Sequence, residues 1–225
     1  NEYDSTERPK QILKGNEKQI MALKKRGVQY VELRSLDVNA FDPLGINETQ
    51  LRFIEVFMLF CLLADSDQID FSEREEIDKN EIDVAHKGRD PLLKLSRNSS
   101  PVLLKDWAKD LLNGMQAVSD LLDQDKNTTP YRDALNLQME KVLHADLTPS
   151  ARMLEEMRET KEGFYYFAKR MSQKHNQYFT KLKLSKEKEM FFDKAATESI
   201  AKQKNIEAAD TKSLDDYLAD YFKQR

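Results

Sequence analysis

The sequence predicts a mainly helical protein that contains one or two β-strands. Glycine and proline are scarce, with six of each in 225 residues, which favours long helices over a fold with many turns. Most segments carry apolar residues at helical spacing, and residues 28–34 form the one clear alternating segment. No internal repeat or low-complexity linker is visible. We therefore expect residues 1–225 to form a single unit, with a strand and loop region at 1–46 and a helical body at 47–225.

The beginning of the chain predicts two short elements before the alternating segment. Residues 1–15 are polar and irregular, which fits the end of a strand followed by a loop. Asn16 can cap a short helix that runs to about Arg26, because its side chain can accept a hydrogen bond from a free backbone N–H. Gly27 then ends this helix.

The alternating segment, residues 28–34, predicts a strand with an unusual polar face. Successive side chains of a strand point to opposite faces, so Tyr30, Glu32 and Arg34 share one face. A strand needs neighbours, so this one pairs with residues 1–13 or with strands outside the chain. A salt-bridged surface face is the more common meaning of such spacing. The alternative is a face for a polyanion and its metal, because carboxylates bind Mg²⁺ and arginine binds phosphate.

The helical body begins with a sequence pattern typical of a helix N-terminus. Asn47 followed by Gln50 forms a capping box, and the helix that it starts is apolar nearly all round, which predicts a place at the centre of the core. This helix contains Cys61, whose apolar neighbours predict a buried, inert thiol. Ser100 and Pro101 are expected to open another helix. The other expected helices span about 72–87, 131–145, 149–160, 162–180, 186–204 and 211–223, with Thr148, Ser185 and Thr211 as N-caps.

The composition excludes several classes of protein. The net charge is −4, with 36 basic and 40 acidic residues, which argues against a nucleic-acid-binding protein. The longest apolar run, residues 53–64, is too short to cross a membrane and contains a glutamate. A single cysteine excludes a disulfide framework and favours a reducing, cytoplasmic compartment. We therefore expect neither a nucleic acid nor a membrane as a partner.

One block of sequence resembles a known family. The segment "GVQYVELRSLDVNAFDPLGINETQLRFIEVFMLFCLLAD", residues 27–65, resembles the signature region of the proteobacterial type of glutamate–cysteine ligase (gamma-glutamylcysteine synthetase). Shorter stretches at 88–91 ("GRDP"), 146–154 ("DLTPSARML") and 207–218 are similar to the family more weakly. The signature positions that match are Tyr30, Val31, Glu32, Leu33, Arg34, Ser35, Leu36, Asp37, Asn39, Phe41, Pro43 and Gly45.

The resemblance implies an activity and a fold. Ligases of this family join the γ-carboxylate of L-glutamate to L-cysteine with ATP and Mg²⁺, through an acyl phosphate, in glutathione biosynthesis. The chain would be the C-terminal part of their α+β, glutamine-synthetase-like fold, with the missing N-terminal part as its partner. We expect the isolated 225-residue piece to be inactive or nearly so. A non-catalytic helical interaction module derived from the same scaffold is the alternative.

The resemblance also implies roles for particular residues. Glu32 would be a Mg²⁺ ligand, and Arg34 would be the catalytic residue that neutralises charge on the phosphoryl group during transfer. Asn1, Arg8 and Lys10 match a family segment before the signature strand and would bind substrate or nucleotide. The same segment departs from the family pattern at three other positions, which favours the alternative reading: Asp4, Glu7 and Gln11.

Overall fold

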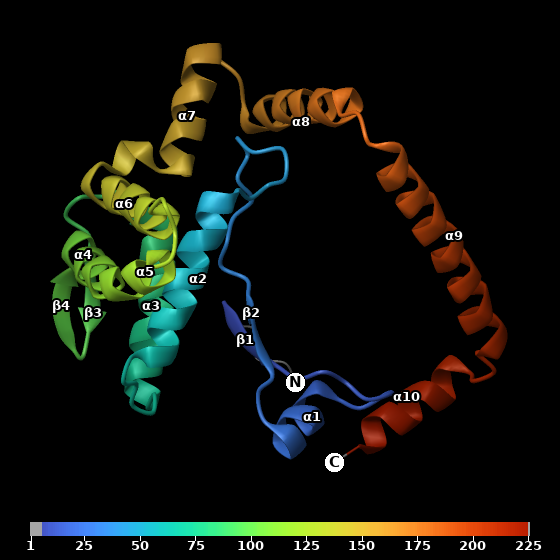
Figure 1. The fold of residues 1–225 in the computed structure, drawn as a ribbon. Helices are drawn as coiled ribbons and strands as arrows, with labels where there is room; N and C mark the ends of the chain where they lie inside the picture. The colour runs from blue at the N-terminus through green and yellow to red at the C-terminus, as the bar shows by residue number, and fades with distance from the viewer. Residues whose placement is uncertain (1–5, 225) are drawn as a thin grey trace. The chain divides into compact units, whose positions relative to one another are not determined.

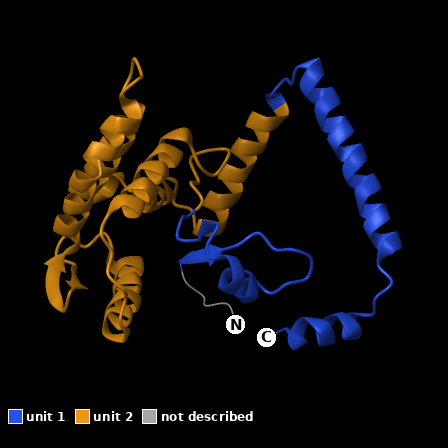
Figure 2. Cartoon of the chain, turned by 60° about the horizontal axis from the view of Figure 1, so that its bottom comes forward, with its two compact units in different colours: residues 1–37, 181–225 blue, residues 38–180 orange. Residues whose placement is uncertain are grey.

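The computed structural model of the protein describes residues 6–224 and is mainly helical, which confirms the expected fold class (Figure 1). The chain forms two compact units, which Figure 2 shows in different colours. Unit 1 comprises residues 1–37 and 181–225, and unit 2 comprises residues 38–180. Unit 1 is therefore built from the two ends of the sequence, while unit 2 is one continuous segment.

Unit 1 contains the predicted strand and its partner. Strand β1 (Glu7–Lys10) pairs antiparallel with β2 (Tyr30–Leu33), so the alternating segment pairs with residues 1–13, one of the two possibilities that the sequence left open. Two further backbone hydrogen bonds extend the pair, from Gln29 N to Lys10 O at 2.8 Å and from Arg34 N to Thr6 O at 2.7 Å. Neither strand has a second neighbour among the described residues, so both edges of this pair are open.

Helix α1 (Gln19–Arg26) connects the two strands. Its C-cap is Gly27 with φ of 73°, as expected, because glycine adopts a left-handed backbone without steric cost. The prediction of Asn16 as the N-cap is wrong. The N-cap residue is Lys18, and its side chain makes no capping hydrogen bond. The Asn16 carbonyl instead accepts a hydrogen bond from the Gln224 side chain.

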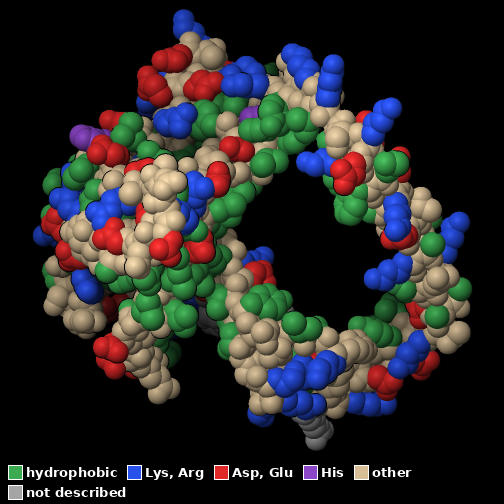
Figure 3. Space-filling view, viewed as in Figure 1, with side chains coloured by type: hydrophobic (Ala, Val, Ile, Leu, Met, Phe, Trp, Pro, Cys, Tyr) green, Lys and Arg blue, Asp and Glu red, His purple; other side chains and the backbone are tan. Residues whose placement is uncertain are grey.

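The rest of unit 1 is helical. Helix α9 (Lys186–Ala209) begins at the expected cap Ser185, whose hydroxyl accepts from Lys188 N, and its side chains are all exposed. Figure 3 shows basic, acidic and apolar side chains interspersed along it. Helix α10 (Leu214–Lys223) is capped by Ser213 and not by the expected Thr211. Gln224, directly after α10, makes hydrogen bonds with its side chain to the backbone of Asn16 and Lys18, just before α1.

Unit 2 is organised around α2 (Glu48–Leu63). The capping box of Asn47 and Gln50 is present in full. The middle of α2 packs against α5 and α6, with Val56 fully buried, which agrees with the predicted place in the core. The C-terminal end of α2 differs: Leu62 and Leu63 are exposed, and so is Cys61, so the prediction of a buried thiol is wrong.

The remaining elements of unit 2 are the helices that the sequence predicts and one β-hairpin that it does not predict. Ser100 and Pro101 were expected to open a helix but lie in strand β4, and the helix begins three residues after Pro101. Thr148 caps its helix as expected. The elements are α3 (Phe71–Lys87), β3 (Lys94–Arg97), β4 (Ser100–Leu103), α4 (Leu104–Gly114), α5 (Gln116–Asp123), α6 (Pro130–Leu143), the 3₁₀ turn η1 (Ala145–Leu147), α7 (Pro149–Thr160) and α8 (Phe164–Lys181).

Within residues 6–224, none of the helices combines the length and the apolar character that crossing a lipid bilayer requires.

Candidate functional site

Glu32 is the centre of a charged cluster on one face of the β1–β2 pair. Its carboxylate oxygen Oε2 lies 3.3 Å from Lys10 Nζ, and Oε1 lies 3.6 Å from Arg34 Nε. The side chains of Glu32 and Arg34 are 38% and 47% exposed, whereas that of Lys10 is only 14% exposed. Glu32 and Arg34 therefore lie together on one face, as the alternation predicted, and remain accessible to a ligand.

The register adds a third cation to this face. Arg8 lies directly opposite Glu32, and Lys10 lies opposite Tyr30, so both β1 side chains project on the same side as Glu32. Among the described residues, the face thus carries three cations and one carboxylate. Four of the five residues expected at the site from the sequence lie on it. The fifth, Asn1, is outside the described residues.

The opposite face of the pair has a different character. Pro9 lies opposite Val31 and Glu7 lies opposite Leu33. The Glu7 carboxylate accepts hydrogen bonds from the hydroxyls of Thr6 and Ser35, at 2.6 and 3.4 Å. Glu7, one of the departures from the family pattern, is thus occupied on the far side of the sheet and does not disturb the face that Glu32 occupies.

Gln11 fixes where β2 begins relative to β1. Its side chain is buried, with 7% exposed, and its amide nitrogen donates to Gly27 O at 3.0 Å and to Arg26 O at 3.4 Å. Because these carbonyls end helix α1, the bond joins the end of β1 to the residue that leads into β2. The change at position 11 therefore supports the strand pair, a role that the sequence pattern did not reveal.

A salt bridge within unit 1 holds the connection between β1 and α1. Arg26 binds the Glu17 carboxylate through both of its terminal nitrogens and also donates to Ile12 O at 2.9 Å. The Arg26 guanidinium, together with the backbone N–H of Lys14, lowers the pKa of Glu17 to about 2. No sequence signal pointed to this pair, because the two residues are nine positions apart and belong to no capping pattern.

The second half of the signature forms an anchored loop in unit 2. Asn39 N donates to Gly45 O at 2.7 Å, and the Asn39 side-chain amide donates to Gln50 Oε1 at 2.8 Å. The Phe41 ring packs edge-on against the buried Phe167, with ring centroids 6.3 Å apart. Asn39, Phe41 and Gly45 therefore fix the shape of the loop and tie it to the start of α2 and to α8.

Comparisons with known proteins identify the family. The family model described as glutamate-cysteine ligase matches residues 1–84, which include both strands of the site. A glutamate–cysteine ligase of Pseudomonas putida is 42% identical over 221 residues, covering 98% of this chain and 42% of that protein. Another, of Alcanivorax borkumensis, is 37% identical over 222 residues, with 99% and 42% covered. The chain belongs to the glutamate–cysteine ligase family.

A solved structure of this ligase family agrees in fold. The crystal structure of the glutamate–cysteine ligase of Francisella tularensis in complex with AMP matches with a TM-score of 0.88 and 36% identity. The match covers 98% of this chain and 43% of that one. The present chain thus spans about two fifths of the length of the curated relatives that it matches. The resemblance seen in residues 27–65 is confirmed at the level of the family.

The charged face carries one group of the kind that can bind a metal ion, the Glu32 carboxylate. Among residues 6–224, no three His, Cys, Asp or Glu side chains gather into a group that could hold a metal ion. Glu32 supplies hard oxygen atoms of the kind that Mg²⁺ binds, but a Mg²⁺ ion takes about six oxygen ligands. The three cations around Glu32 suit a phosphate better than a bare metal ion. Glu32 can therefore serve as a single ligand to a metal that arrives with phosphate oxygens.

Proposed function

We propose that this chain contributes the Glu32 face to the active site of an ATP-dependent glutamate–cysteine ligase. The reaction would join the γ-carboxylate of L-glutamate to the amine of L-cysteine and give γ-glutamylcysteine, in glutathione biosynthesis. The observation that supports this most directly is the placement of Arg8, Lys10 and Arg34 around Glu32 on one accessible face. The names of the relatives and the AMP in one of their structures point the same way.

The first proposed step needs positive charge. An oxygen of the glutamate γ-carboxylate attacks the γ-phosphorus of ATP, and the bond from that phosphorus to the ADP oxygen breaks. Both reactants are anions, so fixed cations at the meeting point lower the barrier. Arg34 is the most exposed of the charged groups on the face and can turn its guanidinium towards the phosphoryl oxygens. Glu32 would hold Mg²⁺, which supplies further electrostatic stabilisation when it is bound.

The second proposed step uses the same face. The cysteine amine attacks the acyl carbon, the bond from that carbon to the phosphate oxygen breaks, and the amine loses a proton as the amide forms. The phosphate leaves as an anion, and Arg34 and Lys10 can stabilise it as they stabilised the transferred group. Neither Glu32 nor Arg34 acts as a nucleophile, so no covalent bond to the protein forms.

The site on this chain is incomplete for that chemistry. A single carboxylate cannot supply the coordination that Mg²⁺ requires, and within residues 6–224 no three His, Cys, Asp or Glu side chains gather into a group that could hold a metal ion. We propose that the remaining groups belong to the part of the ligase that this chain does not match, and that the two units act as one catalytic domain. The isolated 225-residue chain is then inactive or nearly so. Its single cysteine and the proposed activity both suit the cytoplasm.

A chimera tests the proposal. This chain would replace the matching segment of the Pseudomonas putida ligase, and ADP release would be measured with glutamate, cysteine, ATP and Mg²⁺. We expect turnover in the chimera, and a fall of about a hundredfold or more with Glu32→Gln or Arg34→Met. Glu7→Gln is the matched control, because Glu7 lies on the opposite face of the same strands. Full activity of the Glu32→Gln and Arg34→Met chimeras would refute the assignment of the face.

A non-catalytic interaction module remains the competing function. The observation that favours it is the complete exposure of α9, a helix of 24 residues whose side chains are available to a partner. The chimera separates the two functions. Turnover that depends on Glu32 supports the ligase, whereas a folded chimera without turnover supports the module.

A further inference from the structure

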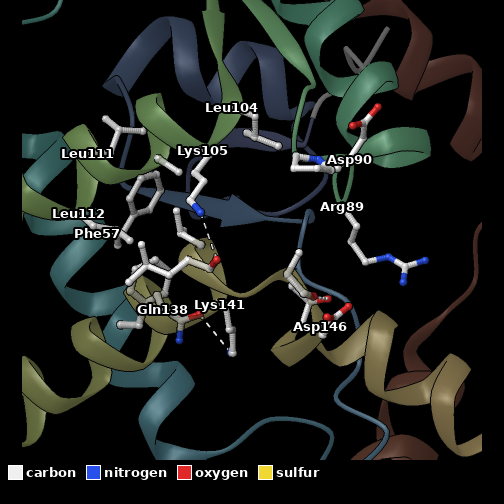
Figure 4. A pocket seen from close by; sticks show the side chains of 18 of the residues that line it. Phe57, Arg89, Asp90, Leu104, Lys105, Leu111, Leu112, Gln138, Lys141 and Asp146 are labelled. Atoms are coloured by element: carbon white, nitrogen blue, oxygen red, sulfur yellow. Dashed lines mark hydrogen bonds between the residues drawn. The ribbon is translucent and has the colours of Figure 1, made fainter.

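Unit 2 contains a cavity that no residue of the charged strands lines. Its volume is about 660 Å³, within the range of about 300–1,000 Å³ that small-molecule sites occupy. Residues of α2, α4 and α6 line it, together with the loop after α3 and the turn η1 (Figure 4). Gly88–Pro91 and Asp146, which come from two of the stretches that resemble the ligase family weakly, meet at this cavity. The proposed ligase chemistry uses none of these residues.

The walls of the cavity are mostly apolar. Leu112 and Met115 belong to the buried core of unit 2, and Phe57 packs against that core, so this side of the cavity is rigid. An apolar group that enters would be removed from water against these side chains. The apolar lining comprises chiefly Phe53, Phe57, Leu104, Leu111, Leu112 and Met115.

Two lysines line the cavity without a carboxylate partner among residues 6–224. Lys105 Nζ donates to the backbone carbonyl of Leu143 at 3.1 Å, and Lys141 Nζ donates to the side-chain oxygen of Gln138 at 3.1 Å. Both acceptors are neutral. Burial, and to a smaller extent the charge of Arg152, lowers the pKa of Lys141. A charged amine in such surroundings gains from an anion that enters the cavity.

The other charged residues at the cavity do not neutralise these lysines. Figure 4 shows the Asp90 carboxylate and the Arg89 guanidinium extending away from Lys105, whose amine reaches into the cavity. Asp90 is also held by its own loop, since its Oδ1 accepts from Leu92 N at 2.9 Å. Asp146 is exposed at the rim.

We propose that this cavity binds a small amphipathic carboxylate. Its apolar body lies against the Phe57 and Met115 side of the cavity, and its carboxylate lies against the ammonium groups of Lys105 and Lys141. The charge-assisted hydrogen bonds to the ligand replace those to neutral acceptors, which favours an acid over an alcohol of the same shape. The cavity shares no lining residue with the Glu32 face, and the proposal does not depend on the proposed ligase reaction.

Calorimetric titration of the 225-residue chain tests the proposal with octanoate as the probe. Octan-1-ol has the same apolar chain without the charge, and octylammonium has the opposite charge. We expect octanoate to bind at least about tenfold more tightly than octan-1-ol, which is the effect of one charge-assisted hydrogen bond, and octylammonium to bind most weakly. Equal affinity for the acid and the alcohol, or the absence of octanoate binding, would overturn the proposal.

Variants test the location. Lys105→Met together with Lys141→Met should weaken octanoate binding about tenfold or more and leave octan-1-ol unaffected. Lys109→Met is the matched control, because Lys109 lies on the same helix as Lys105, does not line the cavity and faces Asp106 at 3.8 Å. Ala108→Phe, which fills the cavity, should prevent binding of both probes without touching a lysine. Unchanged octanoate affinity in the double variant would refute the role of the lysines.

A spectroscopic signal makes the test independent of any variant. In a chain with ¹³C-methyl methionine, octanoate should shift the signal of Met115, which lines the cavity, and leave that of the exposed Met190 on α9 unchanged. The same titration on the ligase chimera shows whether the cavity stays accessible. A Met115 signal that does not respond, or a cavity closed in the chimera, would contradict a ligand site.

Discussion

The Lys10 ammonium nitrogen lies 3.3 Å from Glu32 Oε2, across the antiparallel pair of β1 and β2. The Lys10 side chain is less exposed than that of Glu32. Lys10 therefore contacts one carboxylate oxygen of Glu32 from the buried side, and the other oxygen faces Arg34. The pair fixes the direction of Glu32, the acid that the described residues place on this basic face. Lys10 therefore positions Glu32 and adds charge, and both effects can be measured.

Lys10→Met should lower the kcat of the ligase chimera at least about tenfold, because the variant removes a cation and releases Glu32. Lys10→Arg should recover most of this loss, since the charge is restored. ADP release at saturating ATP measures the effect. The control is Lys25→Met in the last turn of α1, an exposed lysine away from the face. A Lys10→Met chimera with unchanged kcat would remove Lys10 from the proposed site.

Acid should loosen the β1–β2 pair through Glu17. The Arg26 salt bridge lowers the pKa of Glu17 from its ordinary value of 4.5 to about 2, so the charged form is favoured in the folded state. This stabilisation is present above about pH 4.5 and is lost as the pH falls towards 2. Hydrogen exchange at the Gln29 and Arg34 amides, which complete the strand pair, measures it.

Glu17→Gln supplies the comparison for this pH dependence. The variant should exchange these amides faster than the natural chain at pH 6, and the difference should shrink as the pH approaches 2, where Glu17 is protonated in both states. A difference that is constant with pH would show that the Glu17 charge does not stabilise unit 1.

Gly45→Ala should destabilise unit 2 by about 1 kcal/mol or more. Gly45 has φ of +75°, a region that costs other residues about 1–2 kcal/mol, and an added Cβ would lie 3.1 Å from Val38 Cγ1. Urea unfolding followed by the fluorescence of the single tryptophan, Trp107, reports on this unit. Gly163→Ala is the control, because an added Cβ there meets nothing within 4 Å and the backbone is ordinary. Equal effects of the two substitutions would argue against backbone strain at position 45.

Asn47→Ala should reduce the stability of unit 2 by about 0.5–2 kcal/mol, because the hydrogen bond that the Asn47 side chain accepts from Gln50 N is lost. Tryptophan fluorescence during urea unfolding again measures the change. Thr128→Ala, in the exposed loop before α6, should have no measurable effect. Loss of stability in both variants would point to a cause other than the cap.

Local signals made part of this fold predictable. The capping box at Asn47, the glycine that ends α1 and the alternation at 28–34 each act within a few residues, and the structure contains all three. The shared face of Glu32 and Arg34 followed from the alternation alone. Arg8 and Lys10 entered through the family resemblance, and only the register shows that they project on the same side.

The sequence did not predict the hairpin of β3 and β4, because its turn lacks the usual Asn-Gly pair. Asn98 and Ser99 both have positive φ, 52° and 59°, as a two-residue hairpin turn of this kind requires. Asn-Gly is the strong signal for such a turn, and a serine at the second position gives none. Pro101 was misleading because it also starts helices, whereas here it lies in a strand of a two-stranded sheet, whose outer edge needs no N–H.

The interactions that hold unit 1 together are long-range and left no local pattern. Gln224 donates to Asn16 O at 2.6 Å and accepts from Lys18 N at 2.8 Å, across more than 200 positions of sequence. Lys18 also lies over the ring of Tyr221, 5.3 Å from its centroid. Composition and periodicity describe neighbouring positions, so they cannot reveal such contacts.

The division of unit 1 between the two ends of the sequence determines when it can form on the ribosome. Unit 2 is continuous from 38 to 180 and can fold as soon as it has emerged. The hydrogen bonds that Gln224 makes just before helix α1 can form only after more than 200 further residues have been translated. The strands that carry Glu32 are therefore synthesised before unit 2, yet unit 1 can be completed only after it.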